Sequence, residues 1–270
     1  MRVALTIAGS DSSGGAGIQA DLKTFAALGV YGTSAVTAVT AQSTVGVIAA
    51  AALSADLVTA QIEAVAGDID IHATKTGMLA DAAIVEAVAA AIKALDLPLV
   101  VVDPVLASTR GDRLLDADGV EMLRTELLPL AHVVTPNIPE AEILSGRPIA
   151  SGDDLKEAAR RIHDMGAAAV IITGGHPLPA TGHWPPHEVV DLLFDGRVFT
   201  EFHVTRLETP NTHGTGCTFS AAVAAHLALG DALAASAERA QQYVAGAIGH
   251  ALAIGHGHGP LNHFWKAPSG

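Results

Sequence analysis

The chain has 270 residues, of which 50% are hydrophobic and only 16% are charged, so it can bury a large core. Its net charge is −13 with 15 Lys and Arg, which argues against a protein that binds nucleic acid or an anionic membrane, because such binding depends on basic side chains. A single cysteine excludes an intramolecular disulfide, and no apolar run is long enough to span a membrane. The first apolar run, residues 3–8, ends at Gly9, so we expect no signal peptide and a cytoplasmic protein.

Short apolar runs bounded by Gly, Pro or Asp predict buried parallel strands. They are residues 3–8, 73–77, 99–103, 132–135 and 169–173. Helical periodicity lies between them, over residues 84–95 and again over 155–165, where Ser151 precedes the second run as a plausible cap. This alternation predicts βαβ units.

Two later runs, residues 188–194 and 197–204, are separated by Asp195 and Gly196 and predict an antiparallel hairpin at the edge of the sheet. Residues 177–187 contain four prolines and predict a loop. No linker or change of composition divides the chain. We therefore expect residues 1–270 to form one α/β domain of three layers, with a mostly parallel sheet and an antiparallel edge.

Ligands of open α/β sheets bind beyond the carboxyl ends of the strands, so functional residues are expected at these ends. The first strand leads into a glycine-rich segment, residues 9–17, which opens a helix containing Asp21. This segment lacks the features of a P-loop and does not fit GxGxxG. It is credible as a loop that lines a pocket, and the alternative is an ordinary βα turn.

Oxygen ligands follow the third and fourth strands. Asp103 and Glu140 are placed to hold Mg²⁺, which prefers such ligands. The alternative is structural, because Asn137 and Glu140 have the spacing of a helix capping box. After the fifth strand, Thr173, Gly174 and Gly175 form another turn suited to close approach by a ligand.

Residues 211–217 form a glycine-lined turn at the start of a helix, which is typical of an anion-binding site. Cys217 lies at the helix start, where a thiol pKa tends to fall, and could act as a base or nucleophile. The alternative is that Cys217 is a small buried apolar residue. His213, beside this turn, is placed either to contact phosphate or to stabilise the turn.

Together these turns and strand ends resemble the ribokinase-like superfamily, whose members transfer phosphate from ATP to a hydroxyl group without a P-loop. Longer motifs resemble one branch, the hydroxymethylpyrimidine/phosphomethylpyrimidine kinases of thiamine biosynthesis. These motifs are residues 8–25, 40–44, 75–79, 103–105, 135–137 with 140–141, 211–217 and 257–264.

The resemblance implies a role for each matched residue. Gln42 reads the edge of the pyrimidine ring, and other residues line the pocket: Asp21, Gly9, Ala16, Met78 and Val105. ATP is bound by Asn137, Thr173, Gly175 and His213, and Mg²⁺ by Asp103 and Glu140. The backbone N–H groups of Gly214, Thr215, Gly216 and Cys217 stabilise the transferring phosphoryl group. Cys217 helps to remove the proton of the hydroxyl group.

The resemblance implies phosphorylation of 4-amino-5-hydroxymethyl-2-methylpyrimidine and then of its monophosphate, by a protein that is commonly a homodimer. The chain departs from the pattern at Thr173 and Pro210, where many members have Lys, and at Thr109 and Arg110, where Lys and Ser are frequent. These changes remove cations near the expected phosphates and put the second phosphorylation in doubt. Two alternatives are a pyridoxal or pyridoxine kinase and a non-catalytic sensor that retains the pocket.

The chain also has 13 histidines, with His256 and His258 close to His250 and His263. Glycine-flanked histidines near a terminus are more typical of a flexible tail than of a metal site, and no cysteine lies among them.

Overall fold

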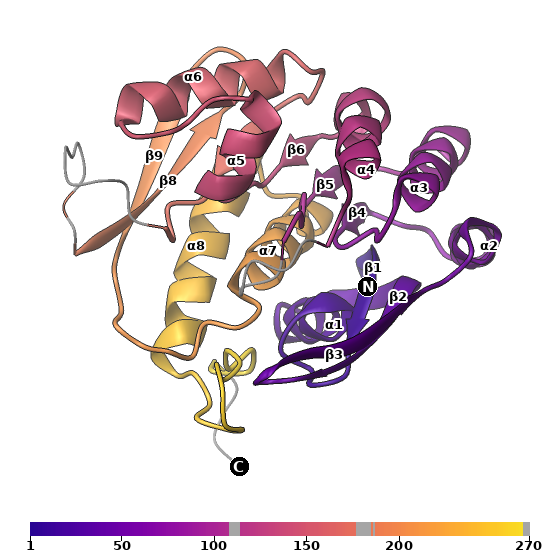
Figure 1. Ribbon diagram of the computed structural model, residues 1–270, viewed down its shortest axis with the longest axis horizontal. Coiled ribbons are helices and arrows are strands. Elements are labelled where there is room, and N and C mark those ends of the chain that lie inside the picture. Colours follow the sequence, from indigo (N-terminus) through magenta and orange to yellow (C-terminus); the bar gives the residue numbers. More distant parts are fainter. Residues whose placement is uncertain (108–113, 177–184, 186, 267–270) are drawn as a thin grey trace.

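The structure is a computed structural model that describes residues 1–107, 114–176, 185 and 187–266. Its centre is a nine-stranded sheet in the order β3-β2-β1-β4-β5-β6-β7-β8-β9 (Figure 1). The strands are β1 Val3–Asp11, β2 Tyr31–Ser43, β3 Gly46–Ala52, β4 Ala73–Thr76, β5 Val100–Val102, β6 Val133–Val134, β7 Val170–Ile172, β8 Glu188–Phe194 and β9 Phe199–Thr205.

In the order of the sheet, the strands from β2 to β7 are parallel, and both edges of the sheet are antiparallel. All five predicted strands are present, and the β8–β9 hairpin confirms the predicted antiparallel edge. The β2–β3 hairpin forms a second antiparallel edge, which the sequence patterns did not indicate. The loop predicted for residues 177–187 lies almost entirely outside the described residues.

Helices cover both faces of the sheet and make three layers (Figure 1). One face carries α1 Gly17–Ala27, α7 Thr215–Leu229 and α8 Leu233–Gly249. The other carries α2 Ala55–Ala66, α3 Ala82–Ala94, α4 Ala117–Met122, the π-helical turn η1 Leu123–Leu127, the 3₁₀ turn η2 Leu128–Leu130, α5 Ile138–Ser145 and α6 Gly152–His163. The predicted three-layer α/β fold is therefore confirmed.

The central strands are buried on both faces, as parallel strands covered by helices must be. Every residue of β5 is an enclosed valine. The neighbouring strand β4 is equally buried although it carries Lys75, whose side chain has no exposed surface. A lysine in this position needs an ionic partner, since a buried unpaired charge is very costly.

The helix starts differ in a way that matters for function. Ser151 caps α6 by accepting a hydrogen bond from the Asp154 N–H, as predicted, and Asp81 caps α3 in the same manner. By contrast, α1, α7 and α8 have no side-chain cap, and among these α7 starts after Gly214, which has a φ of 86°. The Thr215 N–H donates to the Thr212 carbonyl oxygen at 3.2 Å, and no side chain caps the N–H groups of Gly216 and Cys217 that follow it.

The segment after α8 is held against the β2–β3 turn rather than extending freely. The backbone N–H groups of His256 and Gly257 donate to Thr44 Oγ1, at 3.1 and 3.2 Å, and the His258 N–H donates to the Thr44 carbonyl. The expectation of a flexible tail was therefore wrong for these residues. Over the part of the chain that the structure describes, no helix combines the length and apolar character required to cross a bilayer.

Candidate active site

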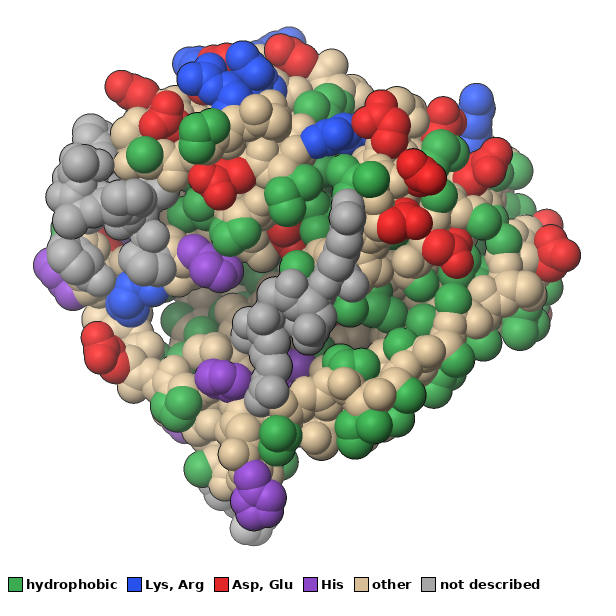
Figure 2. Space-filling view, viewed as in Figure 1, with side chains coloured by type: hydrophobic (Ala, Val, Ile, Leu, Met, Phe, Trp, Pro, Cys, Tyr) green, Lys and Arg blue, Asp and Glu red, His purple; other side chains and the backbone are tan. Residues whose placement is uncertain are grey.

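The carboxyl ends of β1, β4, β5, β6 and β7 meet at one edge of the sheet, because these strands run parallel in close register. The predicted residues that follow them, from Gly9 to Thr173, therefore lie along the same edge. Figure 2 shows that this side of the molecule is hollowed near its middle, with histidine side chains close to the hollow.

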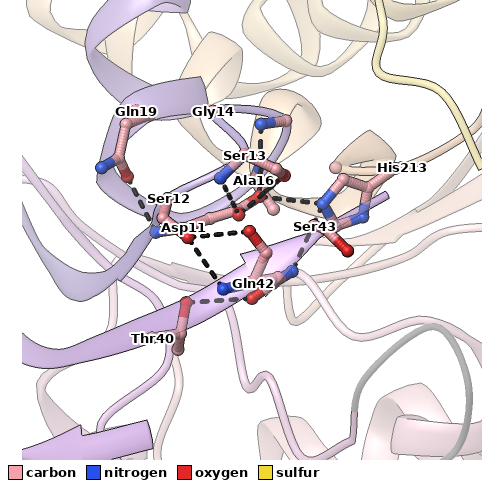
Figure 3. Close-up of polar contacts among 12 residues, drawn as sticks. Asp11, Ser12, Ser13, Gly14, Ala16, Gln19, Thr40, Gln42, Ser43 and His213 are labelled. Carbon is pink, nitrogen blue, oxygen red and sulfur yellow. Dashed lines mark hydrogen bonds and ion pairs between the residues drawn. The ribbon is translucent and has the colours of Figure 1, made fainter. Parts of the chain in front are cut away.

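The glycine-rich turn after β1 is folded around one carboxylate, that of Asp11 (Figure 3). Asp11 Oδ1 accepts a hydrogen bond from the Ser13 N–H at 2.8 Å, and Oδ2 accepts from the Gly15 and Ala16 N–H groups at 3.2 and 2.8 Å. His213 Nε2 lies 2.9 Å from the same Oδ2. Burial opposes ionisation of this carboxyl, but hydrogen bonds from His213, Ser13 and Ala16 outweigh it and lower the pKa of Asp11 to about 2.

His213 connects this turn with Gln42, the residue predicted to read the pyrimidine ring (Figure 3). Its Nε2 lies 3.4 Å from Gln42 Nε2, and Gln42 Oε1 accepts a hydrogen bond from Thr40 Oγ1 at 3.1 Å. These contacts place His213 at the predicted substrate pocket, although the resemblance assigned it to ATP. Contact with ATP stays a prediction, while the alternative role of stabilising a turn is supported by the bond to Asp11.

Close backbone approach explains several glycines at this site. A Cβ at Gly214 would lie 1.8 Å from the Gly15 carbonyl oxygen, so the pocket turn and the start of α7 touch through their main chains. A Cβ at Gly9 would lie 2.4 Å from Met78 Cε, which puts two predicted pocket residues side by side. Val105 is partly exposed beyond β5, as a residue that lines a pocket must be.

Asp21 and Lys75 form a fully buried ion pair below the pocket. Lys75 Nζ lies 3.0 and 3.1 Å from the two carboxylate oxygens of Asp21, and Thr6 Oγ1 donates to Asp21 at 2.6 Å. Burial is the largest single effect and disfavours the ammonium ion, but Asp21, Cys217 and Asp103 together outweigh it and raise the pKa of Lys75 above its usual value. Asp21 has no exposed surface, so its predicted contact with substrate stays a prediction. Sequence reasoning assigned no role to Lys75, since only its place in a short strand hinted at burial.

Asp103 joins this buried pair to the start of α7. Ser220 Oγ donates to Asp103 Oδ2 at 2.9 Å, and Lys75 Nζ lies 3.8 Å from the same oxygen. Cys217 is the third residue of α7, and burial raises the pKa of its thiol to about 12 even though Lys75 opposes the increase. The expectation that the helix start lowers this pKa was therefore wrong, because desolvation is the larger effect.

Asn137 and Glu140 form the capping box that the sequence offered as an alternative. Asn137 Oδ1 accepts from the Glu140 N–H at 3.0 Å, and Glu140 Oε2 accepts from the Asn137 N–H at 2.9 Å. Burial and the nearby charge of Asp103 raise the pKa of Glu140 to about 7. The cap does not exclude a metal site, since two adjacent buried carboxylates are the donor set that suits a cation carried by nucleotide phosphates. The described residues contain no group of three or more acidic, His or Cys side chains arranged for a metal.

The turn after β7 is bound to the next strand and to a cation. The Gly174 N–H donates to Asp191 Oδ1 at 2.8 Å, and a Cβ at Gly174 would lie 2.0 Å from the Val190 carbonyl oxygen. Arg206 donates to the carbonyl oxygens of Gly174 and Gly175, at 3.2 and 2.9 Å. Sequence reasoning did not identify Arg206, because nothing in its local pattern distinguishes it from a surface arginine.

A groove of about 550 Å³ extends from this guanidinium group toward the start of α7. It is lined by Arg206, Leu207, Glu208, Thr209, Pro210 and Thr212. Arg206 thus provides a cation near the position where Thr173 and Pro210 replace lysines of the resembled family. Thr109 and Arg110 lie outside the described residues.

Comparison with known proteins identifies the family. The sequence pattern of the phosphomethylpyrimidine kinases matches residues 11–262, which include every site residue described above except Gly9 and Thr6. The chain belongs to the phosphomethylpyrimidine kinase family. A hydroxymethylpyrimidine/phosphomethylpyrimidine kinase of Synechococcus elongatus is 49% identical to it over 263 residues, which cover 97% of each chain.

Some relatives within the phosphomethylpyrimidine kinase family are longer than this chain. It is 48% identical to a thiamine biosynthesis bifunctional protein of Geobacter sulfurreducens, and the aligned region covers 97% of this chain but only 52% of that protein. Among solved structures, a phosphomethylpyrimidine kinase of Clostridium difficile has a TM-score of 0.79 at 40% identity, covering 92% of this chain and 100% of the other. The pyridoxal kinase of Staphylococcus aureus in complex with ADP has a TM-score of 0.90 at 36% identity, covering 99% and 95%.

Proposed function

We propose that this chain is an ATP-dependent kinase that phosphorylates 4-amino-5-hydroxymethyl-2-methylpyrimidine and then its monophosphate, giving the diphosphate used in thiamine synthesis. The observation that carries the proposal is the direct contact between the pocket turn and the uncapped start of α7, in a member of the phosphomethylpyrimidine kinase family. A substrate held by the first turn would present its hydroxyl group to an anion held by the second.

The pyrimidine would lie between Gly9, Ala16, Gln42, Met78 and Val105. An aminopyrimidine has a donor beside a ring nitrogen, and the amide of Gln42 offers the complementary acceptor and donor. Met78 lies against Gly9 and provides an adaptable apolar wall. Thr40 Oγ1 donates a hydrogen bond to the amide oxygen of Gln42, so this side chain is oriented before substrate arrives.

ATP would lie along the groove at residues 206–212, with its phosphates toward the start of α7. Arg206 lies at one end of this path and donates to the Gly175 carbonyl oxygen, and Asn137 is joined to Thr173 by a backbone bridge. Thr173 and Gly175 are the residues of this turn that we expect to contact ATP. Asp103 and Glu140 are the residues that would hold Mg²⁺. The ion would neutralise charge on the phosphates when bound.

In the transfer, the hydroxyl oxygen of the substrate forms a bond to the γ-phosphorus, and the bond from this phosphorus to the bridging oxygen breaks to release ADP. The N–H groups of residues 214–217 stabilise charge on the oxygens of the transferring group. Cys217 is the proposed acceptor of the hydroxyl proton, a role that only its thiolate form can fill; where the thiol keeps its own proton, the hydroxyl proton leaves on an oxygen of the transferred phosphoryl group. Its thiol is protonated in the free protein, since its pKa is about 12, so alignment of the reactants by the two turns carries most of the catalysis.

A pyridoxal kinase is a second candidate, because the ADP complex of the Staphylococcus aureus pyridoxal kinase has a TM-score of 0.90 to this chain. Pyridoxal also carries a CH₂OH group on an aromatic ring with a hydrogen-bonding edge. The closer sequence relatives favour the pyrimidine, with 49% identity for the Synechococcus elongatus enzyme against 36% for the pyridoxal kinase.

A coupled assay of ADP release tests both functions on four acceptors: hydroxymethylpyrimidine, its monophosphate, pyridoxal and ribose. We expect turnover on the first two, with kcat/KM for hydroxymethylpyrimidine at least about tenfold above that for pyridoxal. Preference for pyridoxal would replace the proposed function with the second candidate. Turnover on hydroxymethylpyrimidine but not on its monophosphate would mean that Arg206 does not compensate for the missing lysines. Binding of hydroxymethylpyrimidine without turnover of any acceptor would indicate a sensor.

We also propose that the chain acts as one domain and as a homodimer, in the cytoplasm. The β2–β3 hairpin supports association, because β3 is an outer strand of the sheet in the described part of the chain and its side chains are exposed, with Ile48 83% exposed. Light scattering on the purified protein should give twice the mass of one chain, and the Ile48→Asp variant should have the mass of a single chain. A monomeric wild type would contradict the proposal.

A further inference from the structure

The buried cluster below the pocket consists of Lys75, Asp21 and Asp103. It therefore has one carboxylate more than the single ammonium group of Lys75 can neutralise. The ammonium group of Lys75 lies 3.0 and 3.1 Å from the oxygens of Asp21 and 3.8 Å from Asp103 Oδ2. One cation therefore serves two carboxylates, and only one of these, Asp103, lies at the carboxyl end of a strand where the phosphoryl group is expected.

The two carboxylates differ in what else holds them. Asp21 also accepts a hydrogen bond from Thr6 of β1, at 2.6 Å. Asp103 is bound by Ser220 of α7, at 2.9 Å, and Ser220 Oγ lies 3.1 Å from the carbonyl oxygen of Cys217. The position of the ammonium group is therefore transmitted through Asp103 and Ser220 to the first turn of α7.

The surrounding backbone is shaped for this ammonium group. A Cβ at Gly77 would lie 2.8 Å from Lys75 Nζ and 2.9 Å from the Ala8 Cβ, so only glycine leaves room for the lysine to reach both carboxylates.

We propose that Lys75 is a positioning residue of the phosphoryl-transfer site. Anchored by Asp21, its ammonium group fixes Asp103 against Ser220 and sets the start of α7 in place for the transferring group, while adding a fixed positive charge behind that turn. This inference rests on the proposed kinase function. It assigns a catalytic purpose to a buried ion pair whose simpler explanation is mutual neutralisation of Lys75 and Asp21.

The decisive variant removes both charges of the pair at once. Lys75→Met alone would leave the carboxylate of Asp21 buried without a counter-charge, which can prevent folding. The double variant Asp21→Asn with Lys75→Met leaves the net charge unchanged, and the amide oxygen introduced at position 21 can still accept the hydrogen bond of Thr6. If methionine prevents folding, Asp21→Asn with Lys75→Gln provides an amide pair for the same test. Thr6→Val is the matched control, because it also removes a partner of Asp21 but leaves Lys75 and Asp103 untouched.

We expect the folded double variant to keep KM for ATP and substrate within about threefold while kcat falls at least about 100-fold, the scale seen when a transition-state contact is lost. Thr6→Val should lower the melting temperature without changing kcat by more than about threefold. The proposal would be overturned if the double variant and Thr6→Val both kept a near-native kcat, because the ion pair would then be purely structural. Equal loss of kcat in both would overturn it too, since any damage to Asp21 would then suffice.

A binding measurement separates this proposal from the kinase function itself. Calorimetry gives the affinity for ADP and Mg²⁺ with and without aluminium fluoride, a mimic of the transferring phosphoryl group. The double variant should bind ADP with normal affinity. The increase in ADP affinity that aluminium fluoride causes should be at least about tenfold smaller in the double variant than in the wild type. A wild type that turns over no acceptor would refute the proposed function, while an unchanged gain in the double variant would refute the role of Lys75.

Discussion

Asp11→Asn is the substitution whose effect follows most directly from the structure. The two oxygens of Asp11 accept hydrogen bonds from opposite sides, Oδ1 from Ser13 and Oδ2 from Gly15, Ala16 and His213. An amide has one acceptor oxygen, so its NH₂ group must face donors on one side. The fall in pKa from the ordinary 3.8 to about 2 corresponds to about 2.5 kcal/mol of stability at neutral pH, which Asn loses.

The dependence on pH gives this prediction its test. The pKa of Asp11 is lower in the folded state than in the unfolded state, so its contribution is complete well above pH 4 and disappears as the pH falls toward 2. Urea unfolding of wild type and Asp11→Asn should differ by about 2.5 kcal/mol at pH 7 and by only about 1.3 kcal/mol at pH 3. The exposed Asp70 provides a control, since Asp70→Asn should change stability by less than about 0.5 kcal/mol at either pH. A difference for Asp11→Asn that is equally small, or that does not change with pH, would refute the reasoning.

Three further predictions concern the other turns. Cys217→Ala should lower kcat at least about tenfold with little change in KM, and a near-native kcat would exclude the thiol as the base. Gly174→Ala should lower the melting temperature by several degrees, because the added Cβ would meet the Val190 carbonyl oxygen. A Cβ added at Gly175 would meet no atom within 4 Å, so Gly175→Ala should affect only KM for ATP. Glu140→Gln should raise the melting temperature more at pH 8 than at pH 5, because a folded pKa of about 7 makes ionisation of Glu140 destabilising above the pKa of the free side chain. It should also lower kcat. Calorimetric melting checks the stability and the coupled assay of ADP release checks kcat, and a uniform loss of stability would contradict the sign.

The sequence was sufficient for the features that depend on neighbours in the chain. The parallel strands are short apolar runs with local boundaries, and the start of α7 was visible in the glycines around Thr215. The β2–β3 hairpin was not visible for a physical reason. Residues 46–52 are largely alanine, a helix former, and their side chains are exposed, so backbone pairing with β2 rather than burial holds this strand in place.

The parts of the site that escaped prediction are contacts between distant positions. Lys75 is 54 residues from Asp21, and His213 is 202 residues from Asp11. Neither pair has a local pattern, since a lysine in a short strand and a histidine in a glycine-rich turn each have many possible partners. The pKa of Cys217 was misjudged for the same reason, because the helix start is a local feature and the burial that outweighs it is not.

The contact between Gly15 and Gly214 limits how this active site can be redesigned. A side chain at position 214 would place its Cβ 1.8 Å from the Gly15 carbonyl oxygen, so the two turns fit only as a matched pair. Transplanting the residue 12–16 turn from a kinase of different substrate range would bring a foreign main-chain path against an unchanged α7. Exchange of substrate preference should therefore succeed when both turns come from the same donor enzyme, and fail when either is grafted alone.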